Sequence, residues 1–91
     1  MTFTNDDIRK IPYGNIDGTA DMVTEECAEL ITAIRHLARG KIQVDELYGE
    51  LADVLIVVQN FILAIGAENE VEQKVSEKIA RYFEKYGKKA N

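Results

Sequence analysis

The sequence predicts an all-α protein, an antiparallel helical bundle of three main helices. Three stretches of the chain repeat apolar residues at spacings of three and four, which is the pattern of a helix with one apolar face. The 91 residues include one proline and six glycines, which leaves little room for a loop-rich all-β fold. Apolar residues make up 46% of the chain and charged residues 30%, which is typical of one globular domain and not of a disordered segment.

Residues 1–18 show little periodicity, and we expect them to form an N-terminal arm. The polar run that begins at Thr4 can cap a single helical turn. Pro12, Gly14 and Gly18 would then end that turn.

The first main helix is predicted over residues 19–38. Arg35 and His36 lie in its last turn, where basic residues complement the helix dipole, and Gly40 is a suitable stop. The apolar side of this helix consists of Val23, Cys27, Leu30, Ile34 and Leu37.

The second helix is predicted over residues 44–65 and ends at Gly66. It is apolar on nearly every side, which is typical of a helix buried on most of its surface. Two other helices of similar length cannot cover it, so we expect a second copy of the chain to complete the core in a homodimer. Asp53, Gln59 and Asn60 interrupt the apolar run, and no membrane span is expected.

The third helix is predicted over residues 68–86, with Gly87 as its stop. Its apolar face consists of Val71, Val75, Ile79, Tyr82, Phe83 and Tyr86. Residues 19–87 together form the predicted helical domain, and residues 88–91 form a tail.

Acidic residues interrupt the apolar faces of the first two helices. Glu26 falls within the apolar stripe of the first helix, and Glu29 lies at its edge three residues later, so the two carboxylates share one face. The second helix carries a similar line of polar residues, with the same spacing of three between its two central acids: Glu46, Glu50, Asp53 and Asn60.

Several uncompensated carboxylates are too costly to bury together, so they must be protonated, paired with cations or bound to metal. Two acidic pairs on facing helices bring oxygen ligands around one point, which suits Mg²⁺ or Mn²⁺. A single E-x-x-E is usually a solvated face, but a second pair on a mostly apolar helix favours the metal site. A di-iron bundle is not supported, because it needs Glu-x-x-His motifs and His36 does not follow a Glu at that spacing.

The third helix carries a basic ridge beside its apolar face, formed by Lys74, Lys78, Arg81 and Lys85. Taken alone, such a ridge is best explained as a solvated surface that pairs with Glu77 and Glu84. Next to an acidic metal site, the same ridge is suited to binding phosphate oxygens.

Charge and composition exclude several classes of function. The net charge of −5 argues against nucleic-acid binding. One cysteine and one histidine exclude an internal disulfide framework and a multi-histidine or zinc-finger site. The polar N-terminus shows no secretory signal, and we expect a cytoplasmic protein.

Two motifs carry a resemblance to a known family. Residues 25–30 (EECAEL) and residues 50–55 (ELADVL) resemble the double signature E-E-x-x-E and E-x-x-D of the MazG-like, all-α nucleoside triphosphate pyrophosphohydrolases. The similarity extends over residues 20–86 and includes the basic third helix.

The resemblance implies an enzyme that hydrolyses a nucleoside or deoxynucleoside triphosphate between the α- and β-phosphates. The products would be the monophosphate and pyrophosphate, and the implied role is clearance of the nucleotide pool. It further implies a dimer, often paired into a tetramer, and Mg²⁺ bound by Glu26, Glu29, Glu50 and Asp53.

The resemblance also implies a role for basic residues of the third helix, and the chemistry of the implied hydrolysis needs a group that activates water. Lys74, Lys78 and Arg81 are expected to contact the substrate phosphates. Glu29, or the neighbouring Glu25, is expected to orient or deprotonate the attacking water, with Glu29 preferred because it lies nearer the metal face. Asn60 either reaches the sugar or a phosphate, or satisfies a buried backbone group.

Two alternatives stay open. The related phosphoribosyl-ATP pyrophosphohydrolases typically carry Tyr-His shortly after the second motif, where residues 55–58 of this chain read LIVV, so this branch ranks lower. A non-enzymatic helical dimerisation module belongs to a different class, and it predicts no stabilisation by divalent metal ions.

Overall fold

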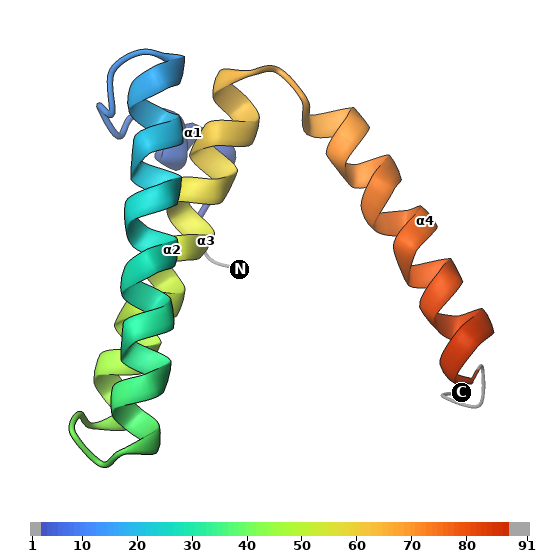
Figure 1. The fold of residues 1–91 in the computed structure, drawn as a ribbon. Helices are drawn as coiled ribbons and strands as arrows, with labels where there is room; N and C mark the ends of the chain where they lie inside the picture. The colour runs from blue at the N-terminus through green and yellow to red at the C-terminus, as the bar shows by residue number, and fades with distance from the viewer. Residues whose placement is uncertain (1–2, 88–91) are drawn as a thin grey trace.

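A computed structural model of the chain describes residues 3–87 and contains four helices (Figure 1). They are α1 (Asn5–Arg9), α2 (Ile16–Ala38), α3 (Val44–Ala64) and α4 (Glu68–Tyr86). No strand occurs within the part of the chain that is described. The all-α class and the three main helices are therefore confirmed. The predicted tail, residues 88–91, lies outside the described residues.

Helices α2 and α3 form an antiparallel pair that makes up most of the packed structure (Figure 1). A short connection reverses the chain between them, and Gly40 there has a φ of 72°, a left-handed conformation that costs glycine little. Ala33 of α2 and Val57 of α3 are the buried apolar residues of the pair. This pairing fixes which faces of the two helices meet, and so positions the acidic residues that both carry.

Helix α1 packs against α3 and belongs to the core, although it lies in the segment expected to be an arm. Its capping box is formed by Thr4 and Asp7, so the helical turn expected at Thr4 is confirmed. Ile8 is only 2% exposed. The backbone carbonyl of Ile8 accepts a 3.0 Å hydrogen bond from the buried side-chain amide of Asn60. Asn60 therefore fills the second of the two roles considered above, that of satisfying a buried backbone group.

Replacing Asn60 by alanine is expected to lower the free energy of unfolding by about 0.5–1.5 kcal/mol, because the buried Ile8 carbonyl loses one hydrogen bond and keeps only the bond from the Ile11 amide. Urea denaturation measures the loss. Gln59→Ala is the matched control, since Gln59 donates an exposed side-chain hydrogen bond to Asn5 and should lose far less. An Asn60→Ala variant of unchanged stability but raised KM would instead support a role in substrate binding.

Helix α2 begins at Ile16, three residues before its predicted start. Asn15 caps it, with its side-chain oxygen accepting a 2.9 Å hydrogen bond from the Gly18 amide. Gly18 therefore lies inside the first turn and does not end the preceding segment. A side chain at this position would collide with the backbone oxygen of Tyr13, so the close approach of the chain explains the glycine.

Helix α4 differs from the expected bundle in its placement. It contacts α3 near the connection that joins them, does not contact α2, and extends away from the helix pair (Figure 1). Gly66, with a φ of 66°, turns the chain before α4. An exposed ion pair of 3.3 Å between Arg9 and Glu68 links α1 to the first turn of α4.

The single chain leaves much apolar surface uncovered. Its radius of gyration is 15.9 Å, whereas about 12 Å is expected for a compact domain of this length. Leu55 on α3 and Phe83 on α4 are each 53% exposed. A single chain thus buries only part of the surface of α3, although the sequence predicts burial on most sides. Helices α1 and α2 cover one side of α3, and α4 turns away from it.

Helix α3 is long and apolar enough, by length and composition, to cross a membrane. Mostly buried core helices of soluble proteins meet the same criterion, whereas 11% of this segment is buried within the single chain. Within α3, Glu50 and Asp53 lie near Glu26 of α2, and the Asn60 side chain donates a hydrogen bond to α1. Polar groups of α3 therefore contact other helices of the chain.

Candidate metal centre

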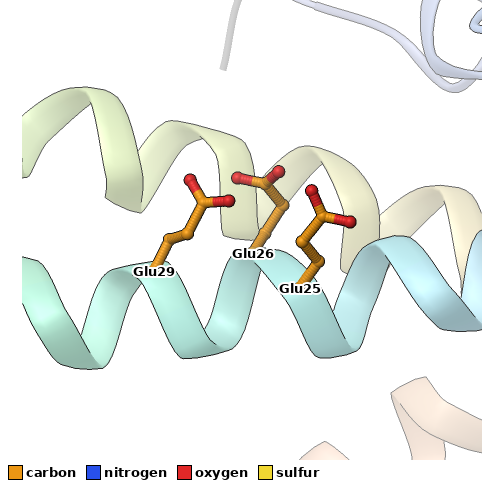
Figure 2. Close-up of side chains that lie close together, drawn as sticks. All are labelled: Glu25, Glu26 and Glu29. Atoms are coloured by element: carbon orange, nitrogen blue, oxygen red, sulfur yellow. The ribbon is translucent and has the colours of Figure 1, made fainter.

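Three glutamates of α2 direct their carboxylates toward α3 (Figure 2). They are Glu25, Glu26 and Glu29, and each offers an oxygen atom within 4.8 Å of the others. Spacings of three and four place side chains on one side of a helix, which explains why these acids gather. Glu26 lies between the other two and is the least exposed of the three.

The facing helix supplies two further acids. Glu50 and Asp53 of α3 and Glu26 of α2 each offer an oxygen within 4.8 Å of the others. The four residues proposed as ligands thus fall into two overlapping groups that share Glu26. Glu29 groups with Glu25 and Glu26, and not with the two acids of α3.

Two oxygen atoms in this cluster are buried without a hydrogen-bond partner. They are Oε1 of Glu26 and Oε1 of Glu50, one from each helix. No Lys or Arg pairs with either residue in the region 3–87. An unpaired buried carboxylate is costly, and a bound divalent cation would remove that cost. A donor set of carboxylate oxygens without sulfur or imidazole fits Mg²⁺ or Mn²⁺.

The electrostatics of the cluster act most strongly on Glu26. Burial raises the pKa of the Glu26 carboxyl above its ordinary value near 4.5. The negative charges of Glu29, Asp53, Glu50 and Glu25 raise this pKa further, in that order. Without a cation, the ionised cluster therefore destabilises the folded chain.

In metal-free buffer at pH 7, Glu26→Gln is expected to raise the Tm, because the substitution removes one of the like charges that repel each other in the cluster. The raised pKa makes ionised Glu26 unfavourable in the folded state. The penalty is absent below the ordinary value near 4.5 and grows as the pH rises through the folded-state pKa, so the gain should vanish near pH 4.

The same comparison is then repeated with Mg²⁺. The ion should raise the Tm of the wild type more than that of the variant, because the variant lacks one ligand. Glu72→Gln, at an exposed position on α4, is the charge-matched control and should behave as the wild type. A Glu26→Gln variant less stable than the wild type in chelator at pH 7 would contradict this account.

A cavity of about 360 Å³ adjoins the acid cluster. Glu29 and Glu50 belong to its lining, together with Thr32, His36 and Glu46. Glu46 was recognised in the sequence only as part of the polar line on α3, and Thr32 was not singled out. The available signal was spacing, since Glu46 precedes Glu50 by one turn and Thr32 follows Glu29 by three residues.

The basic ridge is not brought to the acid cluster within this chain. Lys74, Lys78 and Arg81 are exposed on α4, which makes no contact with α2. Lys74 lies 3.6 Å from Glu77 in an exposed ion pair. For this residue, the contact agrees with the interpretation of the ridge as a solvated surface that pairs with neighbouring acids. Over the residues that are described, Lys78 and Arg81 form no ion pair.

An antiparallel helix pair with a shared carboxylate cluster defines an all-α protein with a candidate divalent-cation site. The sequence profile of the MazG nucleotide pyrophosphohydrolase domain matches residues 15–91, which span α2, α3 and α4. The chain belongs to this family, and the resemblance drawn from the two motifs is confirmed. Comparisons with curated proteins and with solved structures gave no match.

Proposed function

We propose that the protein is a Mg²⁺-dependent nucleotide pyrophosphohydrolase. It would cleave a nucleoside or deoxynucleoside triphosphate between the α- and β-phosphates to give the monophosphate and pyrophosphate. The observation that carries this proposal is the pair of unpartnered buried oxygens, on Glu26 and Glu50, within a MazG domain. They lie where oxygen ligands from two helices converge, beside Asp53.

Glu26, Glu50 and Asp53 would hold the ion, with Glu29 as a further ligand from the overlapping group. Bound Mg²⁺ supplies charge neutralisation at the phosphate oxygens and lowers the pKa of coordinated water. Glu29 lines the adjoining cavity and would accept a proton from the attacking water, with Glu25 as the neighbouring alternative. The water oxygen bonds to phosphorus as the bridging P–O bond between the α- and β-phosphates breaks, and pyrophosphate leaves.

The working form is proposed to be a dimer in which α4 packs against a second copy. The exposed apolar face of α4 and the exposed side of α3 supply the surfaces. Charge complementarity supports the arrangement, because Lys78 and Arg81 have no acidic partner in residues 3–87 while the acid cluster has no cationic one. The second copy would thus bring its basic ridge to the substrate phosphates.

A product assay tests the activity. The wild-type protein is incubated with a panel of ribo- and deoxynucleoside triphosphates, with Mg²⁺ and with chelator. Metal-dependent release of pyrophosphate and monophosphate is the expected result. Release of orthophosphate would overturn the assignment of the cleaved bond. No release from any triphosphate, together with no change in Tm on adding Mg²⁺ or Mn²⁺, would favour a non-enzymatic dimerisation module.

A further inference from the structure

The cavity beside the acid cluster has the size and position of a nucleoside site. Its volume of about 360 Å³ is within the range of small-ligand pockets. Glu29 and Glu50 belong to both the cluster and the cavity, so the two are continuous. His36 follows Glu29 by seven residues, which corresponds to about 10 Å along α2. This span is on the scale of the distance from a nucleotide's phosphate to the far edge of its base.

The lining of this cavity offers hydrogen-bond acceptors and almost no donors. The Thr32 hydroxyl already donates a 3.2 Å bond to the Ala28 carbonyl, so its oxygen faces a ligand as an acceptor. Glu46 accepts a 3.2 Å bond from the Gln43 amide at the start of α3, and its carboxylate retains further acceptor capacity. His36 is the sole donor-bearing side chain of the lining that is free to serve, and no Lys or Arg contributes.

This distribution of hydrogen-bond donors and acceptors determines which nucleobases fit the cavity. A ligand edge that enters a site rich in acceptors must supply its own donors. Cytosine and adenine present an exocyclic amino group with two N–H donors. Uracil and thymine present a carbonyl oxygen at the corresponding position, with a single ring N–H beside it. A carbonyl facing the Glu46 carboxylate would be left unpaired and repelled. Ile42 adds an apolar contact for a ring face.

We propose that this cavity receives the nucleobase of the substrate, and that Glu46 selects bases that carry an exocyclic amino group. The inference rests on the proposed function, because the phosphates must lie at the acid cluster for the base to reach Glu46. The substrate class is then amino-bearing nucleoside triphosphates. Glu46 is a specificity-determining residue and lies outside the groups of acids that converge for a metal ion.

The test compares dCTP with dUTP, because the two differ only at the edge that Glu46 would face. The wild type is expected to show a kcat/KM for dCTP at least about tenfold above that for dUTP. Glu46→Gln keeps the size of the side chain and the capping contact with Gln43, but its amide can donate as well as accept. The ratio should therefore fall toward one, chiefly through faster hydrolysis of dUTP. Glu72→Gln, on the exposed surface of α4, should keep the wild-type ratio.

A binding experiment separates this inference from the activity. His36 is the only histidine of the chain, so its imidazole proton signals in an NMR spectrum report on the cavity without further assignment. Titration with dCMP should shift these signals at lower concentration than titration with dUMP. Signals that neither nucleotide moves, or a wild type that binds or hydrolyses the uracil nucleotide equally well, would overturn the inference. Clear dCMP binding in a protein that hydrolyses nothing would refute the proposed activity and leave the base site standing.

Discussion

Asp53→Asn is expected to lower Mg²⁺-dependent pyrophosphate release by about 10²–10³-fold, the usual cost of losing one group that stabilises charge in a transition state. Asp53 is the most exposed acid of the group it forms with Glu26 and Glu50. Asparagine retains the shape of the side chain but removes its charge. The folded structure should therefore persist while the metal ligand is lost. Steady-state kinetics over a range of Mg²⁺ concentrations measure the effect.

Asp45→Asn is the matched control for this change. Asp45 lies in the first turn of the same helix, is exposed, and belongs to neither acidic group. It should retain nearly full activity. Circular dichroism and thermal melts of both variants establish that they fold. An Asp53→Asn protein that is folded and active at ordinary Mg²⁺ concentrations would show that the acids of α3 are not part of the reaction centre.

The second large effect is expected in mixed dimers. If the ridge of one chain serves the acids of the other, Asp53→Asn and the double variant Lys78→Ala/Arg81→Ala should each be inactive alone. A heterodimer of the two, isolated with two different affinity tags, contains one intact combination of acids and cations. It should regain about half of the wild-type activity, since one of its two sites is complete.

A second heterodimer provides the control, because shared sites predict that it is inactive whereas the first heterodimer is active. One chain carries all three substitutions, and the other is wild type. With shared sites, each site of this dimer lacks either its acids or its cations, so activity should be lost. If each site is instead contained in a single chain, the wild-type chain of this second heterodimer would stay active. The first heterodimer would then be inactive. The two results together therefore decide which chain supplies Lys78 and Arg81.

Much of this fold could be predicted from local patterns. The starts of α3 and α4 follow from apolar periodicity, and Gly40, Gly66 and Gly87 mark the ends of main helices. The early start of α2 was missed because Gly18 suggested a break, whereas the Asn15 cap and the close Tyr13 carbonyl keep the glycine inside the helix.

The acidic site could be predicted in part. A helical turn of about 100° per residue brings Glu26 and Glu29 onto one face, and the antiparallel pairing then sets Glu50 and Asp53 opposite. The division into two groups depends on the offset between α2 and α3, which a single-helix pattern does not contain. The cavity with Thr32 and Glu46 arises from the same offset.

The direction of α4 could not be predicted for a different reason. Val75 and Ile79 on its apolar face are about half exposed. Such a face indicates that another protein surface covers it, but it does not identify that surface. Periodicity identifies the face and carries no information about the chain that meets it. The same holds for Asn60, whose amide suits either a ligand or a backbone carbonyl until α1 is placed beside it.

The sparse interior of the single chain has a consequence for how the protein persists in a cell. Among the described residues, the buried apolar side chains are Ile8, Ala33 and Val57. So small an interior stabilises a single copy only weakly. If the proposed dimer forms, the stability of the fold depends on the protein concentration, as mass action requires. Newly made copies at low abundance would be open to proteolysis, while accumulation would protect them. The concentration of the protein would then determine its lifetime in the cell as well as its total activity.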